Sequence, residues 1–176
     1  MPGIKTHCAQ ALVSGAALAP LCGPANAAVF GLSIVLIDID HVLEYMRQTR
    51  SLKPWGVFPC CRIIETNLHR GFYVFNAFHT LEVLLAICLA GLLSPVFFYI
   101  AAGMLWHCAL DLLMLGRNNL AGRRALSVAE YVIRSRNPDN IIRFDELLRL
   151  KDVAIPDRTW DYPAWLRHWR SCRKPH

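Results

Sequence analysis

The sequence predicts an all-α fold: an integral membrane four-helix bundle of two helical hairpins, followed by a short helical cytoplasmic C-terminal extension. Two long apolar stretches, residues 6–46 and 71–116, contain no Lys or Arg. Such stretches are long enough for hairpins, because a membrane-spanning helix needs about 20 mostly apolar residues. The chain is 55% hydrophobic with a mean hydropathy of +0.31. These values are high for a soluble protein and low for one that is all membrane, so they favour short spans with a polar tail.

Four segments are candidate membrane-spanning helices. Gly23 and Pro24 predict the turn of the first hairpin, and Ser94-Pro95 predicts the turn of the second. Each turn joins two apolar segments that we expect to be helical and antiparallel. The four segments are residues 7–22, 26–46, 72–92 and 94–115.

The rest of the chain is polar and basic. A connection over residues 47–70 separates the two hairpins, and its prolines predict an irregular path. After Arg117 we expect two short helices, residues 124–136 and 139–151, with a break at Asn137-Pro138. The chain therefore divides into a four-span transmembrane domain, residues 1–117, and a polar, basic helical tail, residues 118–176.

The distribution of Lys and Arg predicts the topology. The cations lie at the Lys5 end, in the connection and after residue 116, whereas both hairpin turns lack them. The positive-inside rule then places both termini in the cytoplasm and makes the chain a multi-pass protein of the inner (plasma) membrane. The net charge of +6 follows from this topology and from contact with lipid headgroups, so membrane lipid is the expected partner and nucleic acid is not.

A cleaved signal peptide is an alternative interpretation of the N-terminal region. Lys5, an apolar run and Ala25-Asn26-Ala27 together match the pattern of a positive start, a hydrophobic segment and a small-residue cleavage site. Cleavage would leave three spans and would place the two ends of the chain on opposite sides of the membrane. That arrangement breaks the charge asymmetry, which therefore favours four spans.

Ionisable residues remain inside the apolar stretches, although such groups are costly in hydrocarbon and usually serve a function there. All of them are imidazoles or carboxylates, which bind metals, and none is a fixed cation. In the four-span topology they fall at one depth, near the cytoplasmic face, in four different helices. We therefore expect a cluster. Its candidates are His7, Asp38, Asp40, His41, Glu44, His79, Glu82, His107 and Asp111.

Local spacing supports metal binding by these residues. His107 and Asp111 are four residues apart and share one face of a helix. Asp38 and His41 are three residues apart and do the same. Mixed imidazole and carboxylate ligands favour zinc, iron or manganese over calcium. There are more candidates than one ion needs, which allows a second ion or carboxylates that orient the ligating imidazoles.

Three motifs also point to a known family. In order they are Asp-Ile-Asp-His at residues 38–41, His-Arg-Gly-Phe at 69–72 and Gly-Met-Leu-Trp-His-Cys-Ala-Leu-Asp at 103–111. With Thr6-His7 in the first helix, they resemble the bacterial and archaeal membrane-bound metal-dependent hydrolase family. The motif pattern of that family is similar to that of the zinc-dependent phospholipase C and nuclease superfamily. The resemblance covers residues 6–115.

One motif departs from the family pattern. The family has His-Arg-Gly-x-Thr-His, but no Thr-His follows Phe72 here. Instead, Phe-His-Thr-Leu-Glu arrives at residues 78–82. Either His69 or His79 can therefore hold the family's His role, and depth in the membrane favours His79.

The resemblance implies a metal-dependent hydrolase, with zinc as the expected metal and with one or two ions. A small-molecule or lipid phosphoester near the cytoplasmic membrane face is the expected substrate. Glu82 or Asp40 is the expected general base, and Arg70 and Arg117 are expected to hold an anionic group. The expected metal ligands are His7, Asp38, His41, His79, His107 and Asp111.

Two other functions stay open at this stage. A haem-binding bundle would use His41, His79 and His107 as axial ligands, but haem ligation needs no carboxylates. A non-catalytic adaptor or metal permease would use the cluster as a transit site. Residues 27–36 and 84–100 hold no charged side chain that would continue such a path across the membrane.

Overall fold

The computed structural model describes residues 4–49, 57–58, 61, 76–120, 122 and 124–137. Every regular element within these ranges is a helix, so the predicted all-α class is confirmed. The elements are α1 (Ile4–Cys22), α2 (Pro24–Leu36), α3 (Ile39–Thr49), the 3-10 helix η3 (Ala77–His79), α5 (Leu81–Ala90), α6 (Val96–Arg117) and α7 (Val128–Arg134).

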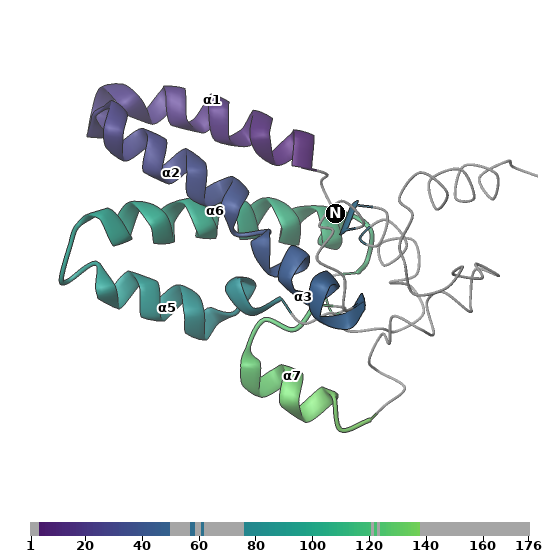
Figure 1. Cartoon of the computed structure of the whole chain (residues 1–176). Coiled ribbons are helices and arrows are strands. Elements are labelled where there is room, and N and C mark those ends of the chain that lie inside the picture. The colour runs from purple at the N-terminus through teal and green to yellow at the C-terminus, as the bar shows by residue number, and fades with distance from the viewer. Residues whose placement is uncertain are drawn as a thin grey trace, which may run out of the picture.

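The helices form two hairpins that pack side by side. Helix α1 packs against α2, α5 packs against α6, and α2 joins the hairpins by packing against α6. Figure 1 shows both hairpin turns at one end of this bundle, with α3 and the N-terminal end of α1 at the other. In the first turn Gly23 has a φ of +81°, which suits glycine, and Pro24 opens α2. The ends opposite the turns therefore meet at one end of the bundle.

Two of the expected helices are interrupted near the end where α3 lies. The helix expected over residues 26–46 is divided, because α2 ends at Leu36 and α3 begins at Ile39. The helix expected over residues 72–92 begins at Leu81, after Thr80 in an extended conformation. The Thr80 hydroxyl donates to the carbonyl of Ala77 (2.8 Å) and so stabilises the turn before α5. Both interruptions bring polar side chains towards the axis of the bundle.

The structure describes only part of the connection and of the C-terminal tail that the sequence predicts. Helix α7 lies within the segment predicted over residues 124–136. The second tail helix predicted over residues 139–151 and most of the connection over 47–70 lie outside the described residues, as does His69.

The α2–α6 contact depends on a glycine. A Cβ at Gly103 would overlap the Ser33 hydroxyl and the Phe30 carbonyl, so only glycine allows this approach of the two backbones. The α1–α2 contact is also close, since a Cβ at Gly31 would lie 3.3 Å from the Ala11 carbonyl oxygen. Small residues at helix crossings are typical of helix packing in membranes.

Two helical stretches are long and apolar enough to cross a membrane. They are Pro24–Arg47, which runs from α2 into α3, and Val96–Arg117, which is α6. Only 33% of the residues in the apolar window of each stretch are buried inside the protein. Large apolar side chains on the outer faces are accordingly exposed, among them Leu12, Leu32, Leu36, Leu85, Leu89, Leu93, Leu105 and Leu113. Length and composition thus identify two candidate spans, and α5 is a shorter apolar helix.

We predict that Gly103→Ala destabilises the bundle by about 1–3 kcal/mol, because the added methyl group overpacks the α2–α6 contact. The control is Gly116→Ala on the same helix, where an added Cβ meets no atom of the described residues within 4 Å. That control should be neutral or should stabilise by up to about 1 kcal/mol through helix propensity. Thermal unfolding in detergent measures both, and equal melting temperatures would contradict the proposed contact.

Candidate metal centre

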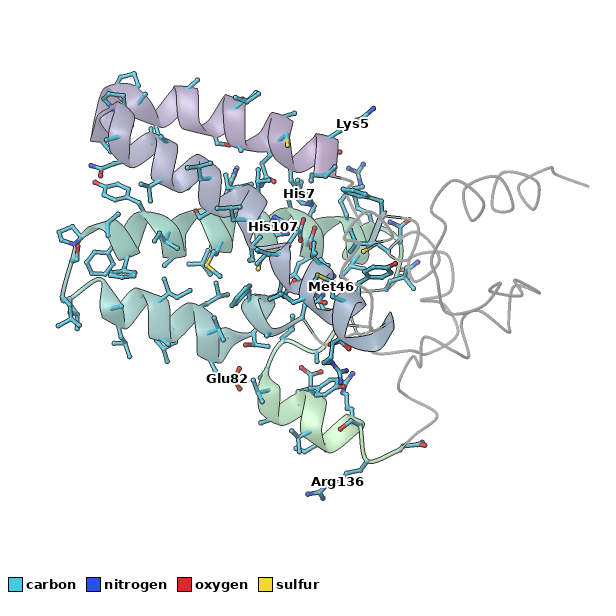
Figure 2. The ribbon with its side chains drawn as sticks, in the orientation of Figure 1. Lys5, His7, Met46, Glu82, His107 and Arg136 are labelled. Carbon is cyan, nitrogen blue, oxygen red and sulfur yellow. The ribbon has the colours of Figure 1, made fainter. Side chains whose placement is uncertain are left out.

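Polar side chains converge at the end of the bundle opposite the hairpin turns. Four elements contribute: His7 comes from α1, Asp38 from the α2–α3 junction, His79 from η3 and His107 from α6. Figure 2 shows His7 and His107 together in the interior at this end, and their rings stack with centroids 3.9 Å apart. His7, His79 and His107 are each buried, with at most 4% of their surface exposed.

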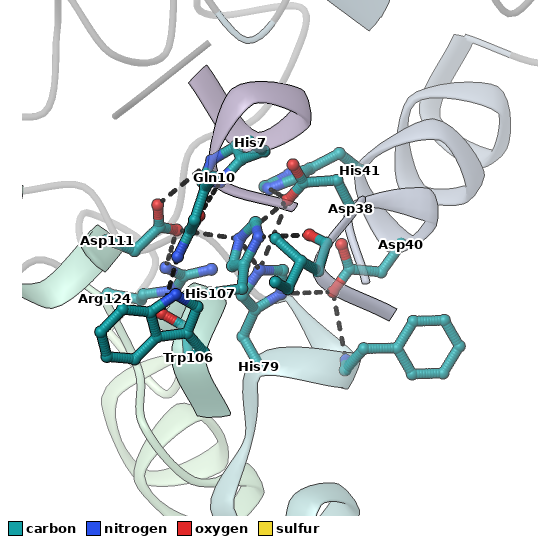
Figure 3. A network of polar contacts seen from close by, with 12 residues as sticks. His7, Gln10, Asp38, Asp40, His41, His79, Trp106, His107, Asp111 and Arg124 are labelled. Atoms are coloured by element: carbon teal, nitrogen blue, oxygen red, sulfur yellow. Dashed lines mark hydrogen bonds and ion pairs between the residues drawn. The ribbon is translucent and has the colours of Figure 1, made fainter. Parts of the chain in front are cut away.

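The Asp38 carboxylate lies at the middle of the cluster (Figure 3). Its Oδ1 atom is 3.4 Å from Nε2 of His107, 3.5 Å from Nε2 of His79 and 3.5 Å from Nε2 of His41. Asp111 lies on the other side, with Oδ2 3.5 Å from Nε2 of His107 and Oδ1 3.5 Å from Nε2 of His7. Four imidazoles therefore direct the same ring nitrogen at two carboxylates.

The imidazoles of His107, His79 and His7 are anchored through their other ring nitrogen. The His107 Nδ1 atom donates to the Ile34 carbonyl (2.7 Å). The His79 Nδ1 atom lies 3.0 Å from Asp40 Oδ2, which also accepts from the Phe78 amide (3.1 Å). A carbonyl or an ionised carboxylate oxygen only accepts hydrogen bonds, so each of these Nδ1 atoms carries a proton.

His7 is anchored in the same way by a side-chain amide. Its Nδ1 atom lies 3.1 Å from Gln10 Oε1. The amide nitrogen of Gln10 donates to the Trp106 carbonyl (3.0 Å), which fixes the amide so that its oxygen faces the imidazole. In the neutral form of all three rings, Nε2 therefore carries a lone pair that points into the cluster.

These lone pairs face one another at short range. The Nε2 atoms of His79 and His107 are 3.2 Å apart, and both are acceptors because Nδ1 holds the proton of each neutral ring. Lone pairs and carboxylates at such distances repel unless a cation lies between them. Two ligand atoms of a tetrahedral zinc ion, each about 2.0–2.1 Å from the metal, are about 3.3 Å apart. The measured separations fit a coordination sphere.

The cluster offers more than one possible set of ligands. In each of three groups the ligand atoms lie within 4.8 Å of one another. Asp111 Oδ1 is buried and accepts no hydrogen bond from the described residues, so it is available as a ligand atom. The three groups are His7–Asp38–His107, Asp38–His41–His79 and His79–His107–Asp111. Buried His and Asp side chains can thus hold a metal ion here.

The structure brings together all six predicted metal ligands. The two predicted bases, Asp40 and Glu82, lie in different places. Asp40 lies behind His79 and contacts its Nδ1 atom, so it orients that imidazole. Glu82 is exposed, and its carboxylate accepts from the Val128 amide (3.0 and 3.1 Å) at the start of α7. Figure 2 shows Glu82 beside α7, away from His107. Glu82 is therefore not part of the cluster. The segment that holds both residues contributes His79 to it.

The site includes one residue that was not predicted from the sequence. Arg124 is buried, with 5% of its surface exposed, and its Nη1 atom donates to Asp111 Oδ2. It precedes α7 in a segment that the Leu81 amide ties to α5 by donating to the Leu126 carbonyl (2.9 Å). Arg124 is the one buried Lys or Arg within the described ranges. No helical spacing relates it to the cluster, so the sequence held no signal for it.

Helix α7 also lies close to α3. Tyr131 of α7 lies near Glu44 and Arg47 of α3. Burial is the main cause that raises the pKa of the Tyr131 phenol, and the Glu44 carboxylate raises this pKa further. Glu44 itself pairs with Arg47 through two hydrogen bonds of 2.7 Å, so it lies outside the cluster.

Comparisons with protein-family models, with curated proteins and with solved structures find no match for this chain.

We predict that Asp40→Ala weakens metal binding by about 10–100-fold, because His79 loses the acceptor that fixes its tautomer and its ring orientation. Titration of the metal-free protein with zinc in competition with a chelator measures the dissociation constant. Glu82→Gln is the matched control, since it changes an exposed carboxylate outside the cluster. An equal affinity in both variants would contradict the orienting role of Asp40.

Proposed function

We propose that the protein is a membrane-embedded metal-dependent hydrolase that acts on a phosphoester near the cytoplasmic membrane face. The observation that carries the proposal is the convergence of four imidazole Nε2 atoms on two carboxylates, with three of the Nδ1 atoms anchored. Such a donor set fits zinc best among common ions. The motif order, which resembles the membrane-bound metal-dependent hydrolase family, supports the same chemistry.

A four-span membrane bundle is part of this proposal. The apolar outer faces of the hairpins and the two long apolar stretches support it. The charged residues support the orientation, because Lys5, Arg47 and Arg117 flank the end that holds the cluster, whereas residues 22–25 and 91–95 at the other end carry no charge. By the positive-inside rule, the cluster then lies on the cytoplasmic side of an inner membrane.

The residues of the cluster have distinct roles in the proposed reaction. A metal bound at the cluster would supply a nucleophilic water at neutral pH and would polarise the phosphoryl oxygen. One of the three candidate groups would hold the ion, and His107, through Nε2, belongs to two of them. Asp40 Oδ2 accepts from Nδ1 of His79 and so holds this imidazole with Nε2 turned towards the metal site. The Arg124 guanidinium offers a fixed positive charge to an anionic substrate group.

The cluster geometry disfavours the haem alternative. The Nε2 atoms of His79 and His107 are 3.2 Å apart, and this separation leaves no room for a porphyrin plane between them. Carboxylates also lie within 3.5 Å of the same nitrogen atoms, which suits a compact metal ion and serves no purpose in haem ligation.

Metal content and hydrolysis, measured together on the detergent-purified protein, test the proposal. We predict that wild type retains zinc and hydrolyses p-nitrophenyl phosphate or bis-p-nitrophenyl phosphate. A chelator should abolish this activity, and added zinc should restore it. His107→Ala should lose both metal and activity, because it removes a ligand shared by two of the candidate groups.

The control for this experiment is Glu82→Gln, which should keep both properties. A wild-type protein without transition metal, or a His107→Ala variant with unchanged metal content and activity, would contradict the proposed function.

A further inference from the structure

A cavity of about 330 Å³ lies among α2, α5 and α6, next to the candidate metal centre. Such a volume is at the lower end of the range for small-ligand pockets. The side chains that define it come from all three helices and from the segments that lead into them. Those that matter here are Val29, Ser33, Ile37, Phe78, Ile87 and Met104.

The lining is apolar except for one side chain. Ser33 is its one polar side chain, and the Ser33 hydroxyl donates to the Phe30 carbonyl (2.7 Å), so the proton of the hydroxyl is already used. A polar ligand would lose its hydrogen bonds to water in such a cavity and would find no replacement. The chemistry of the lining therefore selects a hydrocarbon group.

One end of the cavity adjoins the metal centre. Ile37 directly precedes Asp38, and Phe78 directly precedes His79. Met104 lies three residues before His107 on α6, which is nearly one helical turn. This end of the cavity is therefore lined by close sequence neighbours of three cluster residues.

The other end reaches towards the middle of the bundle. Val29 lies eight residues before Ile37, a distance of about 12 Å along a helix. Leu32 and Leu36 also line the cavity, and they are 58% and 57% exposed on the outer face of α2. The cavity is open, so a chain can enter it sideways from the surface that faces lipid in the proposed bundle.

We propose that this cavity binds one hydrocarbon chain of a lipid phosphoester and places the headgroup of that lipid at the metal centre. This inference rests on the proposed function and narrows its substrate class to membrane lipids. A chain lying along α2 from Val29 to Ile37 ends beside Asp38, where the phosphoester meets the cluster. Water-soluble phosphoesters lack this binding contribution.

Photolabelling of a tryptophan variant tests the inference. Ile87→Trp fills the cavity from α5, whereas Leu89→Trp on the same helix adds the same ring to a position that is 54% exposed. The probe is a phosphatidic acid with a diazirine in its acyl chain, supplied in phosphatidylcholine nanodiscs. We expect wild type and Leu89→Trp to be labelled at residues that line the cavity, and Ile87→Trp to lose this labelling severalfold.

Zinc content and melting temperature show that each variant is folded. Where Ile87→Trp does not fold, Val29→Trp replaces it, with the exposed neighbour Ala28→Trp as its control. Equal labelling of the cavity variant and its control would overturn the inference. Labelling confined to the outer helix faces would also overturn the inference. The probe would then contact the protein as bulk lipid, and another part of the chain would fill the cavity.

The outcomes separate this inference from the proposed function. Loss of labelling in Ile87→Trp, without hydrolysis of any phosphoester by wild type, would support the lipid site and contradict the enzyme. Hydrolysis of p-nitrophenyl phosphate by both variants, with labelling unchanged in Ile87→Trp, would support the enzyme and contradict the lipid site.

Discussion

The repulsion among inward-facing imidazole lone pairs and carboxylates is the constraint on which the rest of the structure depends. His7, His79 and His107 each hold a proton on Nδ1 because Gln10, Asp40 and the Ile34 carbonyl accept it. Their Nε2 atoms then approach one another and the carboxylates of Asp38 and Asp111 to 3.2–3.5 Å. Positive charge offsets the cost of burying such an arrangement. Arg124 supplies part of it through Asp111, and a metal ion among the Nε2 atoms would supply the rest.

The helical framework positions this cluster through backbone features rather than through a large core. Gly103 lets α6 approach α2 closely, and that approach brings His107 to the carbonyl of Ile34. The interruption after Leu36 turns Asp38 inwards, and the extended Thr80 ends η3 so that His79 is buried beside Asp40. Helices α2, α5 and α6 also line an apolar cavity beside the cluster, so one packing arrangement serves both the candidate metal centre and the proposed lipid site.

Much of this arrangement could be predicted from the sequence, and the failures have physical reasons. The exclusion of Lys and Arg from the apolar stretches predicted the helices, and pairs such as His107 and Asp111 predicted a shared face. Glu82 lies outside the cluster because α5 begins only after the extended Thr80, so His79 and Glu82 do not share one face of a continuous helix. Arg124 reaches Asp111 from a segment without regular structure, and such a tertiary contact leaves no periodic pattern in a sequence.

The X-ray absorption spectrum of the zinc-loaded protein at the zinc edge tests the central claim most directly, because it reports the ligands of the ion without an assumed substrate. The model of imidazole and carboxylate ligation predicts nitrogen and oxygen scatterers at about 2.0–2.1 Å, with the outer-shell pattern of imidazole rings and without sulfur. Sulfur at about 2.3 Å would instead place a cysteine in the coordination sphere. That result, or a protein that retains no zinc, would contradict the account.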